Sequence, residues 1–201
     1  MSATQTLTEA DAALNQSSPT PFPLPIQGME QVVAGSVTAL KRTDWWVPGL
    51  RERVGAVLRD VPIERLVDGF SGARPYRVAP PSPSAALRAL TAVGLALAEP
   101  DRAALVHLGI GSVADGAFTE ALNLAALYQA NVLFVVAVHP LDGDAPIAIQ
   151  SAVSIETLAN AFGIAYQSVD GQSESDVHDA VASARNAGGP QLIEARLKGN
   201  S

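Results

Sequence analysis

Two glycines one residue apart, Gly109 and Gly111, stand where the chain could hold a phosphate group. They follow the apolar segment 103–108 and precede a helical pattern over 118–129. The backbone N–H groups of such a turn, together with the N-terminus of the next helix, are a common phosphate-binding arrangement. The alternative is that the glycines only make a tight turn. This second interpretation is favoured, because Ile110 stands between them and cannot ligate a metal.

Other residues capable of metal or acid–base chemistry have simpler structural interpretations. Asp142 and Asp144 could form a metal site, but Asp-Gly is ordinary turn chemistry, which is the favoured interpretation. His107 lies inside an apolar strand pattern and is predicted to be a buried core histidine. For His139, directly after the apolar run 132–138, a structural role is favoured over catalysis. We therefore predict no catalytic residue from these groups.

The composition excludes several classes of protein. The 201 residues carry a formal net charge of −7, whereas proteins that bind nucleic acid or anionic membranes usually present a basic face. The absence of cysteine excludes disulfides, thiolate metal sites and cysteine nucleophiles. The first residues do not form a signal peptide, and the longest apolar run, 132–138, is too short to span a bilayer. A cytoplasmic protein is expected.

The low content of charged residues bears on partners. They make up 16% of the chain, against about 25% in ordinary globular proteins. A partner that covers part of the surface would explain this, and so would an alanine-rich composition that dilutes charge. The segment 84–98, rich in Ala and Leu, predicts a buried helix. Oligomerisation is favoured.

The chain divides into an N-terminal arm and one domain, 26–201, with two parts. Residues 1–25 are rich in Ser, Thr, Gln and Pro and predict an extended or disordered arm. Residues 26–98 predict mostly helices. From 103 to 197, strand and helix patterns alternate, which is typical of a parallel α/β sheet. Ligands bind beyond the carboxyl ends of such strands, where the turn 109–116 is expected.

Several segments, in one order, resemble a known family. The sequence from Gly109, GIGSVADGAFTEALNLAALYQANVLFVVAV, is similar to the thiamine-diphosphate motif of the alpha subunit of 2-oxo acid dehydrogenases, the decarboxylating component of the pyruvate and branched-chain complexes. GMEQVVAG, DWWVPGLRERVGAVLRDVP, IETLANAFGIAYQSVDG and GPQLIEARL match further patterns of that family. The likeness covers residues 26–197. It implies the thiamine-diphosphate-binding fold, a three-layer α/β/α sandwich, here preceded by an N-terminal arm and helices.

The resemblance also implies a cofactor site whose metal ligands are missing. In the family, Mg²⁺ is held by the Asp of a Gly-Asp-Gly turn and by an Asn of a later Asn-Asn pair. Here Ile110 occupies the Asp position, and Val138 and His139 occupy the Asn positions. Isoleucine and valine cannot ligate, and imidazole suits zinc or copper better than magnesium. No metal site is therefore expected at these positions.

The part of the site that would hold the diphosphate is better retained. Four residues match family positions that would contact it: Arg51, Gly109, Gly111 and Ser112. The family's Gly-Gly-Ser-Met-His segment is replaced by SGARPYRVAPPSPS. The chain also ends at Ser201, before the place of the histidine-containing loop that helps to form the family's active site. Together these departures argue against ordinary thiamine catalysis.

Three functions remain as hypotheses. The first is a divergent, catalytically degenerate alpha-subunit homologue without Mg²⁺ or cofactor, with a structural or regulatory role in a homo-oligomer or with a beta-like subunit. The second is an active oxidoreductase subunit that uses thiamine diphosphate and Mg²⁺ with a beta partner. The third is a binding module for another ligand. Ile110 and Val138 would make the place of the family's metal site apolar, as such a change of ligand requires.

Overall fold

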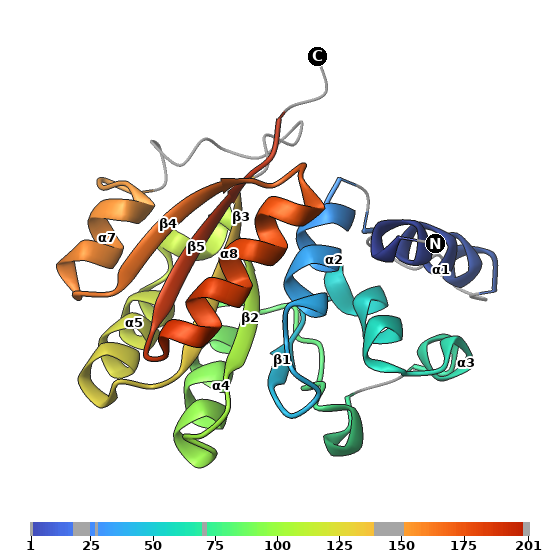
Figure 1. The fold of residues 1–201 in the computed structure, drawn as a ribbon, viewed down its shortest axis with the longest axis horizontal. Coiled ribbons are helices and arrows are strands. Elements are labelled where there is room, and N and C mark those ends of the chain that lie inside the picture. Colours follow the sequence, from blue (N-terminus) through green and yellow to red (C-terminus); the bar gives the residue numbers. More distant parts are fainter. Residues whose placement is uncertain (1, 18–24, 27, 70–71, 139–150, 199–201) are drawn as a thin grey trace.

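The computed structural model describes residues 2–17, 25–26, 28–69, 72–138 and 151–198, and its centre is one parallel β-sheet (Figure 1). The five strands are β1 (Trp45–Val47), β2 (Ala104–Gly109), β3 (Val132–Val138), β4 (Ala165–Asp170) and β5 (Gln191–Arg196). They pair in the order β1-β2-β3-β5-β4, and every pairing is parallel. The predicted α/β class with a parallel sheet is therefore confirmed.

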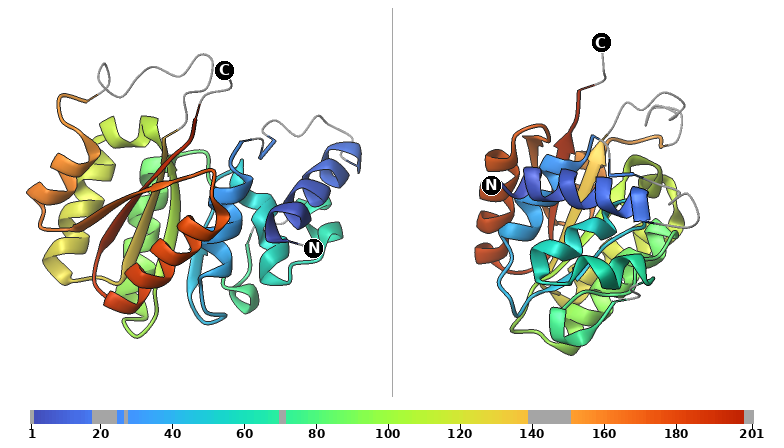
Figure 2. Two further views of the ribbon diagram at one scale, coloured as in Figure 1. Left: turned by 45° about the horizontal axis from the view of Figure 1, so that its top comes forward. Right: turned by 90° about the vertical axis from the view of Figure 1, so that its right-hand side faces the viewer.

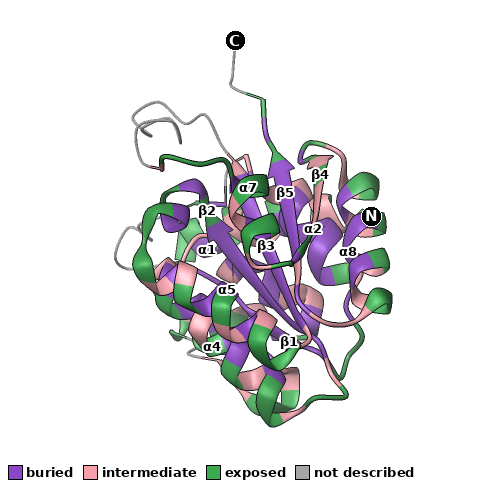
Figure 3. Cartoon of the chain, turned by 90° about the vertical axis from the view of Figure 1, so that its left-hand side faces the viewer, coloured by how far each residue is buried: buried purple, intermediate pink, exposed green. Residues whose placement is uncertain are grey.

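Helices cover both faces of the sheet, which gives the three predicted layers (Figures 1 and 2). On one face lie α2 (Glu30–Thr38) and α8 (Glu174–Ala187), and on the other lie α4 (Ala85–Ala98), α5 (Gly116–Tyr128) and α7 (Ile155–Ala161). The central strands β2 and β3 are buried between these layers (Figure 3). A strand that is covered on both faces must be apolar throughout, which explains the run VLFVVAV of β3.

The N-terminal segment differs from the prediction. Residues Ala3–Ser17 form helix α1 and not an extended arm, so that part of the prediction for 1–25 is wrong. Leu7 and Leu14 lie two turns apart on one face of α1 and are buried against α2 and its neighbours. Thr4 Oγ1 also donates to a Glu174 carboxylate oxygen at 2.6 Å. This tertiary packing stabilises a helix that the composition does not favour. The prolines at 19, 21 and 23 lie outside the described residues.

The predicted helical part, 26–98, also contains a strand. Trp45–Val47 forms the edge strand β1, which pairs with β2 in the register Trp46↔Leu105. Three residues are too few to show an alternating pattern, so this strand was missed. The amphipathic segment 50–59 forms the 3₁₀ helix η1 (Glu52–Arg59), followed by α3 (Ile63–Val67) and the short 3₁₀ helix η2 (Arg74–Tyr76). The order of elements thus brings β1 and η1 beside the carboxyl end of β2.

A buried ion pair fastens the start of β1 to α8. The Asp44 carboxylate is fully buried and accepts from Arg185 Nε at 2.5 Å and from Arg185 Nη2 at 3.2 Å. It also accepts from the backbone N–H groups of Lys41 and Ala103. Arg59 donates to four nearby backbone carbonyls, among them that of Asp44 at 2.7 Å. Asp44 therefore joins three segments that are distant in the sequence.

We predict that Gly35→Ala lowers the free energy of unfolding by about 1–3 kcal/mol. A Cβ at Gly35 would lie 2.5 Å from the Glu174 carbonyl oxygen and 2.9 Å from the His178 backbone nitrogen, so α2 and α8 would have to separate. Gly94, in the middle of α4, is the matched control, because a Cβ there would meet nothing within 4 Å. Gly94→Ala should therefore raise stability by about 0.5–1 kcal/mol. Urea denaturation measures both variants, and an undiminished stability of Gly35→Ala would contradict the close contact.

Part of the outer face of α4 and α5 is apolar and exposed. Leu87 and Leu97 on α4 are 56% and 43% exposed, and Leu127 and Tyr128 on α5 are 68% and 60% exposed. The prediction that the helix at 84–98 is buried therefore holds for its inner face and is wrong for its outer face. Within the described ranges, none of the helices combines the length and the apolar character that a membrane span needs.

Candidate functional site

The glycine turn lies at the carboxyl end of β2, as predicted. Gly109 is the last residue of β2, and residues Ile110–Ala114 form one short 3₁₀ helix, η3, before α5 begins. Ser112 is buried, and its Oγ donates to the Gly109 carbonyl oxygen at 2.5 Å. A Cβ at Gly109 would meet nothing within 4 Å. The space beside Gly109 is therefore open, whereas the Ser112 hydroxyl donates inside the turn and not toward that space.

The N-terminus of α5 carries its own carboxylate. Asp115 is the N-cap residue, and its Oδ1 accepts from the Ala117 backbone N–H at 2.9 Å. The first N–H groups of a helix are the ones that would bind a phosphate oxygen, and the helix dipole favours a negative charge there. Asp115 already supplies that charge. Asp115 is not among the predicted site residues, although Asp is one of the preferred N-cap residues and directly precedes the helix.

The two former metal positions that can be located carry hydrocarbon side chains. Ile110 follows β2 and is 8% exposed, while Val138 ends the adjacent strand β3. Because Gly109 pairs with Ala137, these two residues follow neighbouring positions at the same edge of the sheet. Their side chains offer Mg²⁺ no oxygen. His139, Asp142 and Asp144 lie outside the described residues. Within the described residues, no group of three or more His, Cys, Asp or Glu side chains could hold a metal ion.

Arg51 lies at the same edge of the sheet. It follows the carboxyl end of β1, the strand that neighbours β2, and is the N-cap residue of η1. Its half-buried side chain makes no hydrogen bond or ion pair with the other residues that the structure describes. A guanidinium at this place could bind a phosphate group or a carboxylate.

A polar cluster is buried beneath this edge. His107 in β2 is fully buried, as predicted, and its Nδ1 accepts from Trp46 Nε1 at 3.0 Å. Its Nε2 has no hydrogen-bond partner within the described residues, so the side chain is satisfied at one nitrogen only. Burial, assisted by the positive charge of Arg88, lowers the pKa of His107 to about 3. Arg88 donates through Nη2 to the His107 carbonyl oxygen at 3.2 Å and is itself 6% exposed. Burial lowers the pKa of Arg88, and the nearby Glu52 carboxylate opposes that shift. This cluster fixes the ends of β1 and β2.

Comparison with known proteins gives one family and one fold. The family model described as "Dehydrogenase E1 component" matches residues 1–197. The chain is 30% identical to 3-methyl-2-oxobutanoate dehydrogenase subunit alpha of Mycobacterium tuberculosis, over 85% of this chain and 51% of that protein. It is 30% identical to the pyruvate dehydrogenase E1 component subunit alpha of Bacillus subtilis, over 95% of this chain and 56% of that protein. It therefore spans about half the length of the curated relatives it matches.

The structure is similar to that of transketolase from Campylobacter jejuni. The TM-score is 0.78 at 17% sequence identity, and the match covers 97% of this chain and 37% of the transketolase chain. At this identity the similarity concerns the fold alone. It supports the thiamine-diphosphate-binding type of α/β/α sandwich that the motif resemblance implied.

Proposed function

Because the chain belongs to the dehydrogenase E1 component family and is homologous to alpha subunits of 2-oxo acid dehydrogenases, we propose that it is a catalytically degenerate member. In this proposal the chain keeps the fold and its association surfaces, binds neither Mg²⁺ nor thiamine diphosphate, and has a structural or regulatory role in an assembly. The proposal rests on one observation: hydrocarbon side chains, those of Ile110 and Val138, stand at the ends of two adjacent strands, where the family has metal ligands.

The residues that the structure describes at these two strand ends do not fit magnesium diphosphate. Mg²⁺ requires hard oxygen ligands in near-octahedral geometry. The side chains of Ile110 and Val138 are hydrocarbon, so neither can supply a ligand. Asp115 adds an electrostatic obstacle, since its carboxylate caps the helix end that would face a diphosphate. Two negative groups near one helix N-terminus, without a metal between them, repel each other.

The exposed apolar face of α4 and α5 supports an association role. Leu87, Leu97, Leu127 and Tyr128 lie on two neighbouring helices, and their exposed surface gains stability when a partner covers it. The curated relatives are named as subunits of dehydrogenases. We propose a protein partner for this chain, either a second copy or a beta-like subunit.

Retained cofactor chemistry is the second candidate function. The space beside Gly109 favours it, and so does Arg51, whose side chain has no hydrogen bond or ion pair with the residues that the structure describes, because both belong to a surface that could hold a diphosphate. In this alternative the chain is an active subunit with a beta partner, and Arg51 replaces part of the charge neutralisation that Mg²⁺ supplies. The proposal of degeneracy requires that this surface holds no thiamine diphosphate.

Turnover measured on the assembled protein distinguishes the two candidates. The chain, purified with any subunit that co-elutes and saturated with thiamine diphosphate and Mg²⁺, should reduce ferricyanide no faster with a 2-oxo acid than without it. The Arg51→Gln variant should give the same background. Turnover that depends on the 2-oxo acid and falls on replacing Arg51 would overturn the degenerate role and support the active subunit.

A further inference from the structure

A small pocket lies at the carboxyl edge of the sheet, apart from the glycine turn. The chain leaves β3 toward α7 on one face of the sheet and leaves β4 toward α8 on the other. The carboxyl ends between such diverging connections are the usual place for a ligand in an open α/β sheet. The pocket lies there, with a volume of about 190 Å³. Seven residues line it: Val138, Ser154, Ile155, Glu156, Tyr166, Glu194 and Arg196.

A charged network forms the floor of this pocket. Glu194 in β5 is 7% exposed, and its Oε2 accepts from the Tyr166 hydroxyl at 2.7 Å. Its Oε1 accepts from Arg196 Nε at 2.6 Å. Burial and the Glu194 carboxylate raise the pKa of Tyr166, so this hydroxyl keeps its proton. Both oxygens of Glu194 therefore have partners, and the network holds Arg196 in place.

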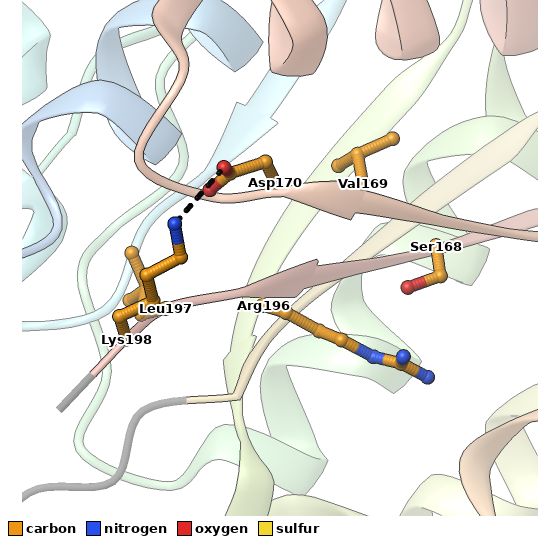
Figure 4. A pocket seen from close by; sticks show the side chains of 6 residues that line it. All are labelled: Ser168, Val169, Asp170, Arg196, Leu197 and Lys198. Carbon is orange, nitrogen blue, oxygen red and sulfur yellow. Dashed lines mark ion pairs between the residues drawn. The ribbon is translucent and has the colours of Figure 1, made fainter.

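Two opposite charges at the pocket can still bind a ligand. Arg196 is ion-paired with Glu194 through Nε and also interacts with the Tyr166 side chain, but its side chain is 63% exposed and keeps further N–H donors. Glu156, in the first turn of α7, is exposed, and its carboxylate has no partner within the described residues. Figure 4 shows the Arg196 side chain running away from Lys198, which is directed toward Asp170. The two cations therefore do not form a common phosphate site.

Two hydrocarbon side chains, Ile155 and Val138, form the apolar wall of the pocket. Ile155 is 3% exposed, and Val138 is half-buried at the end of β3. The volume of about 190 Å³ corresponds to roughly six water molecules. The pocket is partly open to solvent, and this volume is large enough for a molecule with a short aliphatic group.

We propose that this pocket binds a small zwitterion, an α-amino acid with a short aliphatic side chain. The ligand carboxylate pairs with the Nη groups of Arg196, and the ligand ammonium pairs with Glu156. The aliphatic group lies against Val138 and Ile155. An arginine with remaining N–H donors, a carboxylate that has no partner within the described residues, and an apolar wall match the three parts of such a ligand. The pocket shares Val138 with the former metal site but contains none of the residues assigned to the diphosphate.

Calorimetric titration of the full chain with L-valine tests this site. Saturable binding is expected with a Kd on the order of 0.1–1 mM, as for a ligand of this size. Two analogues each lack one charge: 3-methylbutanoate has no ammonium group, and isobutylamine has no carboxylate. Each should bind about tenfold more weakly or not at all, because each loses one charge-assisted hydrogen-bonding group.

Variants locate the binding. Glu156→Gln should weaken the binding of valine about tenfold and leave the affinity for 3-methylbutanoate unchanged. Glu120→Gln makes the same change at an exposed position of α5 and should affect neither affinity. Arg196→Lys keeps the positive charge but removes the planar guanidinium with its paired N–H donors. It should therefore lower the affinity for both valine and 3-methylbutanoate. Circular dichroism checks that each variant is folded. No saturation by valine, equal affinity for valine and 3-methylbutanoate, or an unchanged affinity in Glu156→Gln would each overturn the proposal.

Discussion

Replacing Asp44 with alanine should lower the free energy of unfolding by about 3–5 kcal/mol. The variant leaves the Arg185 guanidinium, whose side chain is 12% exposed, without its bidentate partner. It also removes the acceptor for two backbone N–H groups, those of Lys41 and Ala103. A buried charge that loses its partner costs far more than the pair contributes, because its desolvation is no longer offset. Urea denaturation followed by circular dichroism measures the loss.

Asp60→Ala is the matched control for this experiment. Asp60 pairs with Arg42 at 2.8 Å, but the side chains are 72% and 64% exposed. Water screens such a pair, so removing it should change stability by at most about 1 kcal/mol. Equal losses in the two variants would contradict the role assigned to Asp44. If Asp44→Ala does not fold, Asp44→Asn should still be less stable than Asp60→Asn.

The second large effect is a loss of stability in acid that depends on His107. Its pKa in the folded chain is lowered from 6.5 to about 3 by burial and by the Arg88 charge. Between these values the unfolded chain binds a proton that the folded chain does not, so the free energy of unfolding falls as the pH is lowered from 6.5 toward 3. The contribution is about 1.4 kcal/mol per pH unit. Above pH 6.5 it vanishes.

The His107→Gln variant isolates this contribution. Glutamine does not titrate, and its side-chain oxygen provides an acceptor for the Trp46 indole N–H. Carboxylates contribute to the acid dependence of both proteins, so the quantity to compare is the difference between the two slopes of unfolding free energy against pH. Between pH 6 and 4, the slope of unfolding free energy against pH should be greater for the original chain than for the variant by about 1.4 kcal/mol per pH unit. Parallel slopes would contradict a buried, neutral His107.

Strands β2 and β3 were predictable because each is a buried apolar segment between turn signals. The run Val132–Val138 admits no other element in a layered α/β protein. Strand β1 and helix α1 were not predictable in the same way. Trp45–Val47 is a strand because β2 lies beside it, and α1 is a helix because Leu7 and Leu14 find a core to pack against. Strand β1 depends on tertiary contacts that its three residues do not reveal. Helix α1 also has a local signal, because the Ser2 hydroxyl accepts from the Gln5 N–H and the Gln5 side-chain oxygen accepts from the Ser2 N–H.

The candidate site was predictable in its position and less so in its detail. The glycine turn, Ile110 and Val138 lie at the ends of adjacent strands, as the motif spacing indicated. The sequence did not reveal that Asp115 would cap α5, because the predicted helix began two residues late, at 118 instead of Gly116. Nor did it reveal the pairing of Glu194 with Tyr166, since the order of β4 and β5 in the sheet cannot be read from either strand alone.

Calorimetric titration of thiamine diphosphate into the pure chain, with and without Mg²⁺, tests the central claim most directly. A chain whose metal corner is formed by Ile110 and Val138, and whose α5 N-terminus is capped by Asp115, should give no saturable heat in either case. The same titration of Asp115→Asn, which keeps an N-cap side chain on α5 but removes its negative charge, is the comparison. Binding of thiamine diphosphate that tightens when Mg²⁺ is added would contradict the account and would require oxygen ligands from elsewhere in the chain.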